Sequence, residues 1–191
     1  LFLLILLIPG VVQASFKDVP ETNKYYQAVK YLEDKGTIKG SKNSNFNPEA
    51  NINKADLLKM VLVESGVDVE KKNTYTGFKD VKKNAWYAPY VKKALDLGII
   101  EKGDSFGPTK TVRKWQGLEM IFEAKGIGVQ KIINGETKLK FKDVKKESQY
   151  AGVAKAAETL GIFEEDTFQA NKILKRGDVA EILYKVGTKK I

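Results

Sequence analysis

The chain repeats one ordered set of landmarks three times. The phrase Phe-Lys-Asp-Val begins at Phe16, Phe78 and Phe141, with spacings of 62 and 63 residues. A tyrosine, a glycine, a second phenylalanine and an aliphatic residue follow each phrase in the same order. These landmarks are Tyr25, Tyr87 and Tyr150; Gly36, Gly98 and Gly161; Phe46, Phe106 and Phe168; Ile52, Val112 and Leu174. Repetition at a fixed period indicates one structural unit used several times, so the fold has to be built from three related units.

The repeat predicts the division of the chain. We expect three copies over residues 15–76, 77–139 and 140–191, which we call the first, second and third copy.

The residues that follow each Phe-Lys-Asp-Val phrase predict a first helix in every copy. In the second copy Tyr87, Val91 and Leu95 recur at helical spacing. Each helix is expected to end at a glycine, the usual residue of a left-handed C-terminal cap. The predicted helices are Asn23–Lys35, Ala85–Leu97 and Gln149–Leu160.

A second helix is predicted after the polar loop of each copy. Asn53 and Asp56 resemble a capping box, in which each residue bonds the start of the helix. The apolar stripe of the second helices consists of Leu57, Leu58, Val61 and Leu62, then Leu118, Ile121 and Phe122, then Val179, Leu183 and Tyr184. A single two-helix unit cannot bury both of its apolar faces. We therefore expect an all-α fold in which three helix-loop-helix repeats close into a pseudo-threefold bundle.

The first residues, LFLLILLIPGVVQA, are almost wholly apolar and end in a small-residue pattern. We interpret residues 1–14 as a truncated signal peptide, because the run is too short to span a bilayer and resembles a cleavage region. The alternative is a short apolar strand or buried helix. The mature chain, starting near Ser15, is then exported and has no transmembrane span.

The composition limits the chemistry and suggests the partner. The chain has no Cys and no His, which excludes disulfides, thiolate or imidazole metal sites and Cys or His catalysis. No pair of carboxylates stands out for glycan cleavage, so we expect no enzyme, no catalytic residue, no metal and no cofactor. The net charge is +9, mainly from residues 71–134, which carry +7. A basic exported chain suits an acidic polymer, although a nucleic-acid or general polyanion binder is the alternative.

The landmarks together resemble the surface layer homology domain. The likeness rests on Phe-x-Asp-Val, the tyrosine-bearing helix that ends in Gly-Ile, and the Phe-x-Pro loop before an Ile-Thr-Arg-Ala-Glu-like segment, and it covers about Ser15 to Ile191. The resemblance implies a non-covalent anchor at the bacterial cell surface. It also implies a central bundle of the first helices, and grooves between units that hold an anionic secondary cell-wall polysaccharide or a peptidoglycan-linked glycan. Other S-layer or surface proteins are further possible partners, and no nucleic acid is expected.

The resemblance places the glycan-binding cation of each copy on Lys54, Lys114 and Arg176. Only the third copy keeps arginine, whose planar fork matches a carboxylate bidentately, whereas lysine supplies a point charge. A cation near a helix start is disfavoured by the helix dipole, so structure alone gives little reason for a base at all three positions.

Four further residues are candidates with a structural alternative. Asp18, Asp80 and Asp143 either line the sugar site or cap a turn or the following helix, as aspartate does well. Trp86 either stacks on a sugar face or is an ordinary packing residue.

Overall fold

The computed structural model describes residues 16–40, 44–129 and 138–189. The expected signal peptide over residues 1–14 lies outside this part of the chain. The described residues form six α-helices, two in each copy, and no strand beyond isolated bridges. The prediction of an all-α fold is therefore confirmed. None of these helices is long and apolar enough to cross a membrane.

The first helices are α1 (Tyr26–Asp34), α3 (Ala88–Asp96) and α5 (Ala151–Thr159). They begin two or three residues later than predicted, because the preceding residues form a turn. In the first copy the N–H of Tyr26 donates to the carbonyl of Asn23, at 2.9 Å. The predicted glycine caps are confirmed, since Gly36, Gly98 and Gly161 have φ values of 70°, 71° and 54°.

The second helices are α2 (Lys54–Glu64), α4 (Lys114–Ala124) and α6 (Arg176–Thr188). The predicted cap of α2 is confirmed in one of its two bonds: the N–H of Asp56 donates to Asn53 Oδ1 at 2.8 Å. The second bond differs from a capping box, because Asp56 Oδ2 accepts from the side-chain Nδ2 of Asn53, at 2.7 Å. The predicted apolar stripes are buried apart from Tyr184, which is half-buried.

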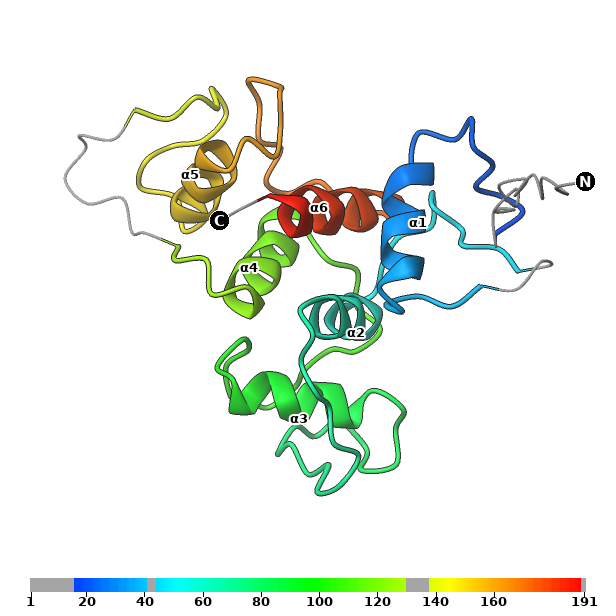
Figure 1. Cartoon of the computed structure of the whole chain (residues 1–191). Coiled ribbons are helices and arrows are strands. Elements are labelled where there is room, and N and C mark those ends of the chain that lie inside the picture. The colour runs from blue at the N-terminus through cyan, green and yellow to red at the C-terminus, as the bar shows by residue number, and fades with distance from the viewer. Residues whose placement is uncertain (1–15, 41–43, 130–137, 190–191) are drawn as a thin grey trace, which may run out of the picture.

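Helices of different copies pack against one another. Helix α1 contacts α6, α3 contacts α2, and α5 contacts α4, so each first helix lies on the second helix of another copy. Helix α2 also contacts α4 and α6. Figure 1 shows α2, α4 and α6 in the middle, with α1, α3 and α5 on the outside. The expectation of a central bundle of first helices was therefore wrong: the second helices are the more completely apolar ones, and they occupy the centre.

Isolated antiparallel bridges join the copies just before the second helices begin. They pair Asn51 with Lys175, Asn53 with Thr111, and Arg113 with Ile173. Each copy is thus tied to both of the others at the same position of the repeat, which places the first residues of the second helices next to the loop of a neighbouring copy.

Candidate functional site

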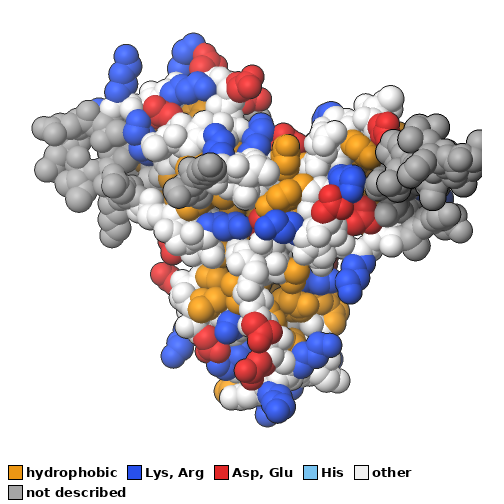
Figure 2. Space-filling view, in the orientation of Figure 1, with side chains coloured by type: hydrophobic (Ala, Val, Ile, Leu, Met, Phe, Trp, Pro, Cys, Tyr) orange, Lys and Arg blue, Asp and Glu red, His pale blue; other side chains and the backbone are white. Residues whose placement is uncertain are grey.

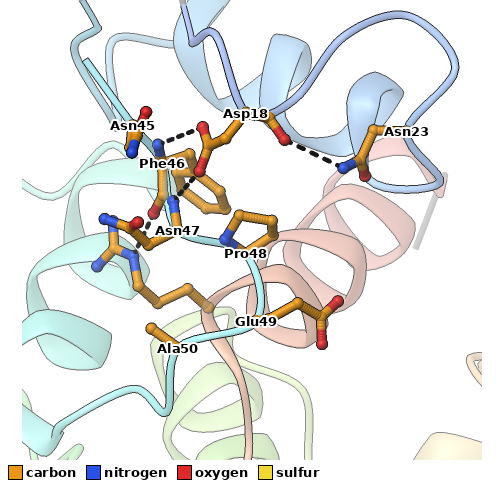
Figure 3. A pocket seen from close by; sticks show the side chains of 9 residues that line it. Asp18, Asn23, Asn45, Phe46, Asn47, Pro48, Glu49 and Ala50 are labelled. Carbon is orange, nitrogen blue, oxygen red and sulfur yellow. Dashed lines mark hydrogen bonds between the residues drawn. The ribbon is translucent and has the colours of Figure 1, made fainter.

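The aspartate of each Phe-Lys-Asp-Val phrase holds the loop of its own copy. Figure 3 shows Asp18 accepting from the N–H groups of Phe46 and Asn47, at 2.8 and 2.7 Å. Asp80 and Asp143 accept from the equivalent pairs of amides in their copies, at 2.6–2.8 Å. A carboxylate that binds two amides fixes the loop backbone. The aspartates therefore support the loops, and not merely the turns next to them.

The loop that each aspartate holds presents a buried phenylalanine. Phe46, Phe106 and Phe168 are at most 3% exposed and belong to the core. Each ring contacts the phenylalanine that opens its own copy, with centroids 5.3–5.8 Å apart. Each pair of phenylalanine rings thus forms a packed aromatic surface beside its loop.

The three predicted cations all contact such an aromatic surface in a neighbouring copy. Arg176 Nε donates to the carbonyl of Phe46 at 2.9 Å, and its guanidinium carbon lies 4.8 Å from the centre of that ring. Lys54 Nζ donates to the carbonyl of Phe106 at 3.1 Å and lies 4.7 Å from its ring centre. The first residue of each second helix therefore points away from its own helix, which explains how a base is tolerated there despite the helix dipole.

Lys114 makes the corresponding contact in a more enclosed place. Its Nζ lies 3.6 Å from the ring centre of Phe163 and 5.3 Å from that of Phe168, and the residue is only 9% exposed. Burial, with a smaller effect from Lys172, lowers the pKa of Lys114 to about 8. Burial, followed by the charge of Lys110, also lowers the pKa of Lys54.

Each cation lines a hollow together with the copy that it reaches. Groove 1 is lined by Arg176 and first-copy residues including Lys39 and Lys59, with a volume of about 200 Å³. Groove 2 is lined mainly by Lys54 and second-copy residues, and measures about 690 Å³. Groove 3 is lined mainly by Lys114 and third-copy residues, and measures about 180 Å³.

A further hollow of about 620 Å³ is lined by the loop that contains Phe46, and Arg176 lines it as well. Figure 3 shows this hollow with Asp18, Glu49 and the loop between Asn45 and Ala50. Its two acids already have partners: Asp18 binds the loop amides, and Glu49 Oε2 lies 2.5 Å from Lys175 Nζ.

Trp86 lies outside the lining of these hollows but close to groove 1. It precedes α3, is 53% exposed, and has Lys59 Nζ 5.9 Å from its ring centre. Tyr87 and Tyr90 contact its ring edge to face. Its equivalent in the third copy, Gln149, lines groove 2. The structure thus brings Trp86 to the neighbourhood of the arginine-bearing groove.

The sequence reasoning missed Lys39 and Lys59. Both face the groove that contains Arg176, and neither belongs to a recognisable motif. A comparison of the three copies with one another would have found them, because acids stand at the matching positions of the second copy, Glu101 and Glu119.

Sequence comparisons match all three copies of the repeat to known proteins. The S-layer homology domain model matches residues 15–58, 77–114 and 140–180, which together make up more than half of the chain. The chain is 24% identical over 90% of its length to the "S-layer protein sap" of Bacillus anthracis, and 29% identical over 62% to the "Surface-layer 125 kDa protein" of Lysinibacillus sphaericus. It is also 25% identical over 92% to "Exoglucanase XynX" of Acetivibrio thermocellus. The matches span 21%, 10% and 16% of these longer proteins.

Proposed function

Because the chain belongs to the S-layer homology domain family, we propose that it is a non-covalent cell-wall anchor whose grooves bind an anionic wall glycan. The family and the surface-layer relatives indicate an exported protein at the cell surface. The glycan is either a secondary cell-wall polysaccharide or a peptidoglycan-linked glycan. The proposed role is binding without catalysis, by a module that attaches a larger surface protein to the wall.

The placement of Arg176 carries this proposal. Its Nε is bound to the Phe46 carbonyl, and no other hydrogen bond or ion pair of the guanidinium occurs within the described part of the chain. The Nη groups therefore remain available for a carboxylate, which a guanidinium fork binds bidentately. Contact with a buried ring holds the side chain in place, so little conformational entropy is lost on binding.

We also propose the closed arrangement that the repeat predicted, with the copies spanning residues 15–76, 77–139 and 140–191 around a pseudo-threefold axis. The pairwise bridges before the second helices and the packing of α1 on α6 support it. Such an arrangement gives three grooves at matching positions of the repeat, at Lys54, Lys114 and Arg176. Because the three grooves belong to one chain and engage the same polymer network, together they increase retention even if each groove binds weakly.

The remaining candidates take two different roles in the proposal. Trp86 offers an indole face to a sugar ring. Asp18, Asp80 and Asp143 act through the loops, because their oxygens are occupied by backbone amides. They are positioning residues of the grooves.

Cosedimentation with purified cell walls tests the proposal. The chain should sediment with Lysinibacillus sphaericus sacculi, and should remain in solution when the sacculi have been stripped of their secondary glycan. The combined variant Lys54→Ala, Lys114→Ala and Arg176→Ala should lose retention while its circular dichroism is unchanged.

The matched control removes three exposed lysines that line none of the grooves, Lys71→Ala, Lys82→Ala and Lys145→Ala. Equal losses in both triple variants would contradict the grooves and favour diffuse attraction of a polyanion. A nucleic-acid binder would retain DNA with a steep dependence on salt. Figure 2 shows basic and acidic side chains interspersed on the visible face, without one concentrated basic patch.

A further inference from the structure

The three grooves have matching positions but differ in the charge of their walls. Groove 1 contains three bases, Lys39, Lys59 and Arg176, and one acid, Asp56. Bases and acids are equal in number in groove 2, where they are Lys54, Lys102, Lys110, Glu101, Glu119 and Glu123. They are equal in number in groove 3 as well, where they are Lys114, Lys172, Lys185, Glu165, Asp178 and Glu181. Only groove 1 therefore has an excess of positive charge in its lining.

The charges of groove 1 are also available to a ligand. Neither Lys39 nor Lys59 forms an ion pair within the described residues. The single acid, Asp56, is engaged by the side-chain amide of Asn53 in the cap of α2. Groove 3 differs, because Lys172 and Lys185 are paired with Asp178 and Glu181 at 3.6 and 3.5 Å.

Groove 2 does not favour an acidic ligand either, because the carboxylates that line it are unpaired. Glu101, Glu119 and Glu123 have no ion-pair partner among the described residues. Burial, followed by the charges of Glu123 and Glu101, raises the pKa of Glu119. An acidic ligand placed here would meet three carboxylates beside the three lysines, so the groove offers its charge no net attraction.

Groove 1 has an aromatic neighbour in addition. Lys59, which lines the groove, lies over the exposed indole of Trp86 in the second copy. A sugar ring has an apolar C–H face that packs on such a surface, while its acidic substituent points to the cations. The volume of about 200 Å³ is small, and suits one sugar residue of a polymer.

We propose that groove 1 is the acid-binding groove of the chain, in which Lys39, Lys59 and Arg176 surround the carboxylate of an acidic sugar and Trp86 covers the adjoining ring. This inference rests on the proposed function and adds a specificity: grooves 2 and 3 are not equivalent to groove 1 and take no acidic residue of the glycan.

Matched charge reversals test the assignment. Lys39→Glu with Lys59→Glu changes groove 1, and Lys102→Glu with Lys110→Glu changes groove 2 by the same net charge. The first variant should bind L. sphaericus sacculi about tenfold more weakly than the unmodified chain, and the second should show a clearly smaller loss. Equal losses in both variants, or a greater loss in the second, would overturn the assignment.

The two tryptophans provide a second readout. The chain contains only Trp86 and Trp115, and Trp115 lines groove 2. With Trp115→Phe, the remaining Trp86 should change its fluorescence when the acidic polysaccharide released from the same sacculi is added. With Trp86→Phe, the remaining Trp115 should show no change at concentrations that saturate the first variant. A response from Trp115 alone, or the same response from both, would refute the assignment to groove 1.

These outcomes separate the two proposals. If the unmodified chain does not sediment with sacculi, the proposed function fails. If it sediments but the groove 1 reversal has no effect, the proposed function stands and the assignment to groove 1 fails.

Discussion

At the scale of single residues, raising the pH has two opposing effects at Lys114: it favours folding, and it removes a positive charge from groove 3. Its ammonium lies over the rings of Phe163 and Phe168. The charged residues that affect its pKa are Lys172, Glu165, Asp178 and Asp143. Burial lowers its pKa from 10.5 in the unfolded chain to about 8. Between these two values the unfolded chain binds more protons, so the contribution of Lys114 to stability rises with pH. Over the same interval groove 3 loses the positive charge of Lys114.

We expect Lys114→Met to isolate this titration. Methionine fills a similar volume and carries no charge, so at pH 7 the variant should have the larger free energy of unfolding. Its advantage should shrink between pH 8 and pH 10, as the lysine of the unmodified chain becomes neutral in the folded state. Urea unfolding of both proteins at several pH values measures this difference. A constant difference across that range would contradict a lowered pKa.

At the scale of elements, the contact between the first and last helices depends on a glycine. An added Cβ at Gly177 would lie 2.5–2.7 Å from ring atoms of Tyr25, so α1 and α6 approach each other too closely for any side chain there. The Tyr25 hydroxyl also donates to Asp178 at 3.2 Å. The absent side chain is thus a requirement of packing between copies.

Gly177→Ala should therefore destabilise the fold by about 1–3 kcal/mol, the usual cost of overpacking a core. The control is Gly128→Ala, because an added Cβ at Gly128 meets nothing within 4 Å. Thermal unfolding of both variants measures the effect. Equal midpoints for the two variants would show that Tyr25 moves aside without cost.

The features of these helices that could be predicted are those whose sequence signal comes from neighbouring residues. The glycine caps and the apolar stripe around Leu57 depend on neighbouring residues, and both were predicted correctly. The choice of partner helix was not predictable, because Gly177 contacts Tyr25 across about 150 residues of chain and carries no periodic signal. Lys59 was missed for a different reason: it belongs to no motif, and only the acid Glu119 at the matching position of the second copy distinguishes it.

At the scale of the whole molecule, one buried ion pair distinguishes the copies. Glu64 ends α2, is 4% exposed, and has Oε2 2.5 Å from Lys125 Nζ at the end of α4. Its Oε1 accepts from the Tyr31 hydroxyl at 2.7 Å. The matching positions of the other copies are Ala124 and Val186, so this link between the first two copies is made once.

Removing one partner of this pair should be costly. Lys125→Met leaves the carboxylate of Glu64 buried without its cation, and should lower the free energy of unfolding by about 3–5 kcal/mol. The double variant Glu64→Leu with Lys125→Met should recover much of that loss, because no buried charge remains. Urea unfolding of the singles and the double gives the coupling energy. Additive losses would indicate that the two residues do not act as a pair.

The packing of α1 on α6 also has a kinetic consequence. Helix α1 can pack on its partner only after α6 has left the ribosome, so the first copy cannot complete its packing before the third copy has been made. Contacts between such distant segments raise the loop-closure entropy that folding must overcome and slow the final step. An exported chain in which α1 packs on α6 therefore keeps its first copy incompletely packed, and able to pass through a translocation channel, until α6 has been made.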